Sequence, residues 1–175
     1  MIYLLPMIIC ISGTPGTGKT YLSSKFNSNV INLNDFSKRN GCTKGYDRKR
    51  KSEIVNVECL KKKLKNVDNI ILEGHYAHLL KCNIVIILRT SPKILKKRLI
   101  ERGYDLQKIQ ENLEAEALGI ITQEALKMNE NVYEIETTSL DIDVIMNEIR
   151  KILNGEGGDY KAGKINYMEE ILEWF

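Results

Sequence analysis

Short, almost continuously apolar runs alternate along the chain with longer segments in which apolar residues recur every three or four positions. The short runs are rich in β-branched residues, which is typical of strands buried on both faces of a sheet. Five strands are predicted, at 7–12, 30–33, 69–73, 84–88 and 132–136. Such alternation indicates consecutive βαβ units in one α/β domain.

The longer segments between the strands are predicted to be helices. They are expected from the glycine-rich segment at 13–18 to about residue 27, over 53–65, from 91 onward, over 105–128 and over 141–153. Ser91 and Pro92 are typical of a helix start, as N-cap and first helical residue. With a phosphate loop after the first strand, this pattern predicts a three-layer α/β/α fold whose five-stranded parallel sheet has the order 2-3-1-4-5.

A single domain is expected over residues 1–153. The glycine-rich stretch 154–158 is predicted to be a flexible linker, followed by a short tail helix whose aromatic residues dock on the domain. The chain has 175 residues, of which 43% are hydrophobic and 28% charged. These values exclude a disordered or fibrous protein.

The apolar opening at 1–11 lacks a basic n-region and runs straight into a glycine-rich loop, so it is interpreted as a strand rather than a signal peptide. No other apolar run approaches the roughly 18 residues that cross a bilayer. We therefore expect a soluble, cytoplasmic protein without a membrane partner. Its four cysteines form no C-x-x-C pair and are expected to be reduced thiols rather than a disulfide framework: Cys10, Cys42, Cys59 and Cys82.

Charge is distributed unevenly along the chain. Residues 1–100 carry 19 Lys and Arg against 6 Asp and Glu, whereas residues 101–175 carry 7 against 17. Eleven of the basic residues lie between 38 and 65. This concentration is compatible with a polyanionic ligand, and also with an ordinary solvated helix face.

Residues 13–20 read Gly-Thr-Pro-Gly-Thr-Gly-Lys-Thr and match the phosphate-loop pattern G-x-x-x-x-G-K-[ST]. The pattern follows a predicted strand and opens a predicted helix, which is the context that confirms it. Gly13, Gly16 and Gly18 allow backbone N–H groups to wrap phosphates. Lys19 is expected to reach the β and γ oxygens of ATP, and the Thr20 hydroxyl to hold Mg²⁺.

A second buried strand ends in Glu73, where proteins with a phosphate loop place a carboxylate that holds Mg²⁺ or its water. His75 follows two residues later and is expected to lie beside the nucleotide, although a lone histidine is often a structural residue. His78 is interpreted as structural.

Three arginines are candidates for neutralising phosphate charge. Arg98 and Arg102 are four residues apart and share a helix face, and Arg89 ends the fourth strand at the sheet edge where ligands bind. The alternative for the helical pair is two solvated side chains. The polar segment 34–47 is either a surface loop or the site of a phosphate acceptor, for which it offers these side chains: Asp35, Lys38, Arg39, Tyr46 and Asp47.

Several blocks in this order resemble the sixth adenylate kinase isoenzyme family, whose members are small P-loop proteins. The blocks are the phosphate loop, Gly-Tyr-Asp at 45–47, Glu-Gly-His at 73–75, Leu-Arg-Thr at 88–90, Arg-Gly-Tyr at 102–104, Lys-Ile-x-Glu-Asn at 108–112 and Val-Tyr-Glu-Ile at 132–135. They cover roughly residues 7–153. The resemblance implies the fold of a nucleoside monophosphate kinase, ATP and Mg²⁺ as cofactors, and AMP as the acceptor.

The resemblance also implies roles for particular residues. ATP contacts are expected from Gly16, Gly18, Lys19, Thr20 and Tyr21. An AMP-binding insertion is expected at 34–56, and a short lid at 101–111 with Arg102 on ATP. Members of the family also serve as ATPases in small-ribosomal-subunit assembly, which implies a small-subunit ribosomal protein and its rRNA as partners.

This chain departs from the family in having Glu73 where members often have Asp, and residues 103–149 contain no arginine. A slow adenylate kinase that also hydrolyses ATP is therefore expected. The alternatives are an assembly factor switched by ATP and a small-metabolite kinase of the shikimate-kinase type.

Overall fold

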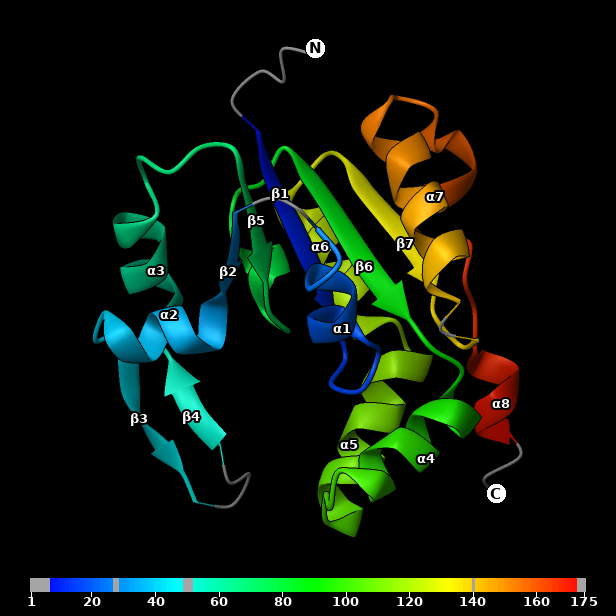
Figure 1. Cartoon of the computed structure of the whole chain (residues 1–175). Helices are drawn as coiled ribbons and strands as arrows, with labels where there is room; N and C mark the ends of the chain where they lie inside the picture. Colours follow the sequence, from blue (N-terminus) through cyan, green and yellow to red (C-terminus); the bar gives the residue numbers. More distant parts are fainter. Residues whose placement is uncertain (1–6, 27–28, 49–51, 140, 173–175) are drawn as a thin grey trace.

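The computed structural model describes residues 7–26, 29–48, 52–139 and 141–172. Their centre is a five-stranded parallel sheet of order β2-β5-β1-β6-β7 (Figure 1). The strands are β1 (Ile8–Gly13), β2 (Val30–Asn32), β5 (Ile70–Glu73), β6 (Ile84–Arg89) and β7 (Val132–Glu136). Counted along the chain within the sheet, this is the predicted order 2-3-1-4-5, and each strand agrees with its predicted range within one residue at either end.

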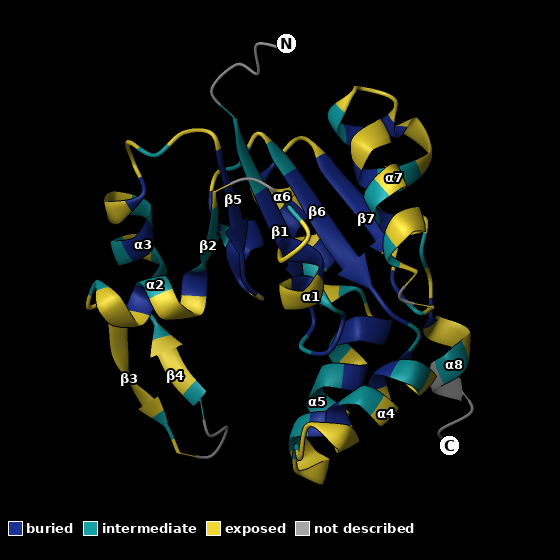
Figure 2. Cartoon of the chain, in the orientation of Figure 1, coloured by how far each residue is buried: buried dark blue, intermediate teal, exposed yellow. Residues whose placement is uncertain are grey.

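The sheet is covered on both faces, because alternate residues of its buried strands point to opposite sides (Figure 2). On β6, Ile86 and Leu88 belong to one apolar cluster together with residues of α1 (Lys19–Ser23) and α7 (Ile142–Leu153). Val85 and Ile87 of the same strand belong to a second cluster with residues of α3 (Val57–Lys63) and α6 (Ile120–Met128). This arrangement confirms the predicted three-layer α/β/α fold.

Two further helices extend the domain beyond the carboxyl edge of the sheet (Figure 1). They are α4 (Pro92–Glu101) and α5 (Leu106–Ala117), and they pack on each other through a small apolar cluster of their own. Pro92 begins α4 as predicted, although Ser91 makes no side-chain capping hydrogen bond there.

The predicted helix over 105–128 is wrong in one respect, because it is two helices. Gly119 has a left-handed backbone with φ of 61°, which ends the continuous hydrogen-bonding pattern and separates α5 from α6. The first predicted helix is also shorter than expected, since α1 ends at Ser23. Its predicted end near residue 27 lies outside the described residues.

The segment between β2 and α3 has a structure that the apolar pattern did not predict. It forms α2 (Leu33–Arg39) and a hairpin of β3 (Thr43–Asp47) and β4 (Ser52–Val55), and it is therefore not a surface loop. The helix predicted from residue 53 begins only at Val57, because the Asn56 side chain caps α3 by accepting a hydrogen bond from Cys59 N at 3.2 Å.

The stretch predicted as a flexible linker is packed against the domain. After α7 the chain forms the 3₁₀ turn η2 (Gly157–Tyr160), in which a Cβ added to Gly157 would lie 2.7 Å from the Tyr133 ring. Lys161 then pairs with Tyr133 beside the edge strand β7. The tail helix is α8 (Met168–Leu172). Tyr167 before it is buried against the domain as predicted, with its hydroxyl donating to Glu136 Oε1 at 3.0 Å. The other two aromatic residues predicted to dock, Trp174 and Phe175, lie outside the described residues.

The prediction of reduced thiols is wrong, because the structure joins the cysteines in two disulfides. Cys10 of β1 is bonded to Cys82, which precedes the neighbouring strand β6, and Cys42 at the base of the hairpin is bonded to Cys59 of α3. The sequence spacings, 72 and 17 residues, give no sign of this proximity, which arises only from the folded chain. Among the described residues, no helix is long and apolar enough to cross a membrane.

We expect the Cys42–Cys59 bond to stabilise the base of the hairpin. Replacing both residues with serine should lower the free energy of unfolding by roughly 3 kcal/mol, the chain-entropy value for closing a loop of this length. Thermal unfolding of the oxidised protein and of the double variant measures the difference. Equal stability, or intact-mass and alkylation data showing four free thiols in protein purified without reductant, would contradict the assignment.

Candidate functional site

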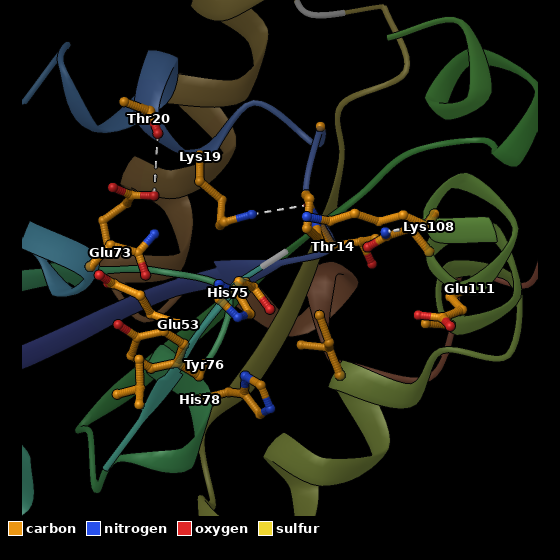
Figure 3. A pocket seen from close by; sticks show the side chains of 18 of the residues that line it. Thr14, Lys19, Thr20, Glu53, Glu73, His75, Tyr76, His78, Lys108 and Glu111 are labelled. Carbon is orange, nitrogen blue, oxygen red and sulfur yellow. Dashed lines mark hydrogen bonds between the residues drawn. The ribbon is translucent and has the colours of Figure 1, made fainter. Parts of the chain in front are cut away.

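A large cavity opens at the carboxyl edge of the sheet, with a volume of about 1030 Å³. Its walls come from the phosphate loop, the β3–β4 hairpin, the segment after β5 and the two helices α5 and α6 (Figure 3). The position agrees with the rule that open α/β sheets bind ligands outside the carboxyl ends of their strands.

The phosphate loop connects β1 to α1 in a conformation that requires its glycines. Gly16 and Gly18 have φ values of 95° and 96°, and a Cβ added to Gly13 would lie 2.5 Å from the Leu88 carbonyl oxygen of β6. The Lys19 ammonium donates hydrogen bonds to the carbonyl oxygens of Gly13 and Thr14, at 2.7 and 3.0 Å. The loop is therefore folded around its own lysine.

The Lys19 side chain is buried, although it lines the cavity. Burial lowers the pKa of its ammonium to about 8, and the carboxylates of Glu73 and Glu116 partly oppose this shift. The site thus holds a poorly hydrated cation, which favours binding of a phosphate group that can replace the missing water.

Three contacts hold the back of the loop, from α4, from the end of β7 and from α5. Arg98 of α4 donates to the carbonyl oxygens of Gly16 at 3.3 Å and of Thr137 at 2.9 Å. Thr137 in turn donates through its hydroxyl to the Thr17 carbonyl oxygen at 2.8 Å. The third contact joins the Thr14 hydroxyl to a carboxylate oxygen of Glu116.

Arg98 and Arg102 were predicted to act together on phosphates, and the structure separates them. Arg98 lies behind the loop and uses its guanidinium on backbone carbonyls, whereas Arg102 lines the cavity. Arg102 is close enough for its charge to contribute to lowering the pKa of Lys19.

Glu73 lies at the end of β5 with 3% of its surface exposed. One of its oxygens accepts a hydrogen bond from the Thr20 hydroxyl at 3.4 Å, and the other accepts one from the amide of Asn32. Asn32 ends the neighbouring strand β2 in direct register with Glu73. A hydroxyl and a carboxylate so placed fit a Mg²⁺ ion, which binds oxygen ligands and keeps several of its waters.

His75 projects into the cavity between the phosphate loop and the hairpin (Figure 3). His75 is exposed, and its ring is accessible from the cavity. Partial desolvation by the surrounding protein lowers the pKa of His75 to about 4, and the charge of Lys19 contributes to the same shift. The imidazole is therefore neutral at physiological pH.

His78 is held from both sides, in agreement with its structural interpretation. Its Nδ1 lies 2.8 Å from the Ser12 hydroxyl, and its Nε2 lies 3.0 Å from a carboxylate oxygen of Glu124. The ring is 2% exposed, although one edge contributes to the cavity wall.

The residues predicted to bind the acceptor are only partly brought together. Lys38 and Tyr46 line the cavity at the hairpin, and Lys38 forms an ion pair with Glu53 at 3.5 Å. The other acceptor candidates do not line the cavity: Asp35, Arg39, Asp47 and Arg89. Arg89 is instead buried between the carboxylates of Glu116 and Glu134. Tyr21, which was expected to contact ATP, lies outside the cavity beside Lys25.

A group of residues on α5 lines the cavity but was given no individual role in the site, although the resemblance included a block at 108–112. Lys108, Glu111 and Asn112 follow Tyr104 at helical spacing and face the cavity. Their spacing of three and four residues is the signal that could have identified them as one face. Glu53 and Tyr76 were also missed, because the apolar pattern gave no hairpin and therefore no wall opposite the phosphate loop.

Comparisons with known proteins agree with this geometry. A family described as "AAA domain" matches residues 9–119. A protein of Pyrococcus furiosus named "Putative adenylate kinase" is 39% identical over 175 residues, covering 96% of this chain and 97% of the relative. A protein of Methanosarcina barkeri with the same name is 38% identical over 182 residues, covering 94% of this chain and all of the relative. Among solved structures, shikimate kinase from Acinetobacter baumannii in complex with shikimate superposes with a TM-score of 0.57. The two sequences are 13% identical, and the match covers 87% of this chain and 94% of that one. At this identity the match shows a shared fold alone.

Replacing Lys19 with alanine should abolish nucleotide turnover, because it removes the ammonium that is expected to bind the phosphates of ATP. We expect a loss of roughly 100-fold or more, as for other preorganised groups that stabilise transition-state charge. The thermal midpoint should not fall, since a buried ammonium is removed. Lys25→Ala is the matched control, because Lys25 is exposed outside the cavity. Near wild-type turnover of a folded Lys19→Ala protein would place the active site elsewhere.

Proposed function

The chain belongs to the same P-loop family as these archaeal relatives, and we propose on that premise that it is an adenylate kinase, which transfers the γ-phosphoryl group of ATP to AMP and forms two ADP. Membership of this family supports the activity of a nucleotide kinase. AMP as the acceptor is our own addition to it.

The observation that supports an AMP acceptor is the continuity of the cavity. The phosphate loop with Lys19 lies at one end, and Lys38 of α2 and Tyr46 of the hairpin lie at the other. His75 and Tyr76 lie between them (Figure 3). Two nucleotides can therefore lie end to end, with the phosphate of the acceptor directed toward the γ-phosphate of the donor.

The reaction needs positioning and charge neutralisation more than proton transfer. An AMP phosphate oxygen is already ionised at neutral pH, so its attack on the γ-phosphorus requires no general base. Lys19 binds the phosphates of ATP from the floor of the cavity, and Arg102 and Lys108 add positive charge from α4 and α5. Thr20 and Glu73 would hold Mg²⁺, which would supply positive charge to offset that of the ATP phosphates.

A second candidate activity, ATP hydrolysis, is favoured by His75. A neutral imidazole directed into the cavity can accept a proton from an attacking water, which AMP transfer does not need. Coupling of hydrolysis to a ribosomal protein or rRNA stays a prediction from the resemblance and from the basic segment 38–65.

The acceptor is identified by measuring ADP formation from Mg-ATP with AMP, CMP, UMP, shikimate or no addition. AMP should raise the rate by at least about tenfold over ATP alone, a difference of about 1.4 kcal/mol in the barrier. A rise with shikimate instead would favour a metabolite kinase. An equal rate with and without every acceptor would contradict the kinase proposal and leave hydrolysis.

Glu73 and His75 should separate the two activities. Glu73→Gln should lower AMP-dependent transfer and hydrolysis together, by about 10- to 100-fold, and raise the Mg²⁺ concentration needed for half-maximal rate. His75→Ala should lower hydrolysis by roughly 100-fold, the contribution of a general base, and transfer to AMP much less. Both rates are measured on the same preparations. Equal loss of both activities in His75→Ala, or loss of neither, would leave His75 a structural residue.

A further inference from the structure

Arg89 ends β6 at the edge where the acceptor was expected, but its guanidinium is turned into the protein. Its Nε donates to Glu116 Oε1 at 2.8 Å, and its Nη2 donates to the Glu116 carbonyl oxygen at 2.7 Å. Its Nη1 donates to a carboxylate oxygen of Glu134. Only 2% of Arg89 is exposed, so its charge is used inside the domain.

Glu116 is the partner that connects Arg89 to the phosphate loop. It lies in the last turn of α5 and is also 2% exposed. Its Oε1 accepts hydrogen bonds from Arg89 and from the backbone N–H of Thr90 at 3.0 Å, and its Oε2 accepts one from the Thr14 hydroxyl. Both oxygens of this carboxylate are therefore engaged.

Thr14 contacts both Glu116 and the lysine of the loop. Its carbonyl oxygen accepts hydrogen bonds from Lys19 Nζ at 3.0 Å and from the Thr17 hydroxyl at 2.9 Å. A chain of polar contacts thus runs from Arg89 through Glu116 and Thr14 to Lys19. Of these four residues, only Lys19 is expected to bind phosphate directly.

We propose that Glu116 is a positioning residue of the ATP site, which fixes Thr14 and through it the Lys19 side chain, and that Arg89 is its counter-ion rather than a ligand of the acceptor phosphate. This inference rests on the proposed function only in assigning ATP to the phosphate loop.

A carboxylate beside a phosphate site needs such a counter-ion. A buried negative charge close to the loop would repel the phosphates of ATP, and its own burial would be unfavourable without a partner. Arg89 offsets the charge of Glu116, while its second carboxylate partner, Glu134, also accepts hydrogen bonds from the Thr122 hydroxyl and the Gly163 N–H. Glu116 can therefore hold Thr14 with less repulsion of the ligand. The hydrogen bond is of the charge-assisted kind, which is stronger and more directional than a bond between neutral groups.

The position of Glu116 also connects the loop to the helix that faces it across the cavity. Lys108 lines the cavity two turns earlier on the same helix, α5. The contact between Glu116 and Thr14 therefore joins the loop that carries Lys19 to the helix that carries Lys108, and both lysines line the cavity (Figure 3).

The proposal is tested by calorimetric titration of ATP, without acceptor, into Thr14→Val, Thr14→Ser, Glu116→Met and the double variant Thr14→Val/Glu116→Met. Valine keeps the shape of threonine without its hydroxyl, and serine keeps the hydroxyl. Glu116→Met keeps the side-chain length, and Arg89 retains Glu134 as its partner. Glu114→Gln is the matched control, because Glu114 lies on the same helix but is exposed.

Thr14→Val and Glu116→Met should each weaken ATP binding by about tenfold, the order expected when a hydrogen bond to a charged group is lost. The double variant should be no weaker than the weaker single variant, because both changes remove the same contact. Thr14→Ser and Glu114→Gln should stay within about twofold of wild type. A purely structural role would lower the thermal midpoint and the fraction of binding-competent protein but leave the dissociation constant unchanged.

Unchanged ATP binding in Thr14→Val, or additive losses in the double variant, would overturn the proposal. If Glu116→Met does not fold, the comparison of valine with serine at position 14 decides alone. The role of Arg89 is tested with Arg89→Lys, which should weaken ATP binding and leave the KM for AMP unchanged. A raised KM for AMP with normal ATP binding would instead assign Arg89 to the acceptor. Because ATP binding is measured without acceptor, failure of the AMP kinase proposal would not affect this result.

Discussion

The ammonium of Lys19, buried at the carboxyl edge of the sheet, is the charge on which the arrangement of the site depends. A buried cation is unfavourable unless its hydrogen bonds are satisfied, and here the carbonyl oxygens of Gly13 and Thr14 satisfy them. Those carbonyls are available only because the loop is held from behind by Arg98, Thr137 and Glu116. The fold therefore maintains a preorganised, poorly hydrated positive site, which is the property that phosphoryl transfer requires.

The insertion after β2 extends this phosphate site into a larger cavity. The α2 helix and the β3–β4 hairpin form a wall opposite the phosphate loop, and the Cys42–Cys59 bond joins the base of that wall to α3. The tail contributes on the other side, where the backbone N–H of Gly163 donates to the buried carboxylate of Glu134 at 2.8 Å. Residues after α7 thus complete the network that neutralises Arg89.

The sequence predicted the sheet well, because buried parallel strands and a phosphate loop have strong local signatures. It also predicted three residues that line the cavity, since Lys19 and Thr20 belong to the phosphate-loop motif after β1 and Glu73 ends β5. The acceptor end was predicted poorly, since β3 and β4 are exposed and lack an apolar alternation (Figure 2). Arg89 and the disulfides were misjudged because their partners are distant in sequence, and a strand-end arginine shows no sign of whether a buried carboxylate will pair with it.

The central claim is that one cavity holds donor and acceptor together. It is tested most directly by calorimetric titration with a bisubstrate analogue in which two adenosines are joined through a chain of phosphates. We expect one molecule to bind per chain and to be displaced by ATP and also by AMP. Its affinity should be well above that of either nucleotide, because the two binding events are linked. Binding no tighter than ATP, or displacement by ATP but not by AMP, would contradict it.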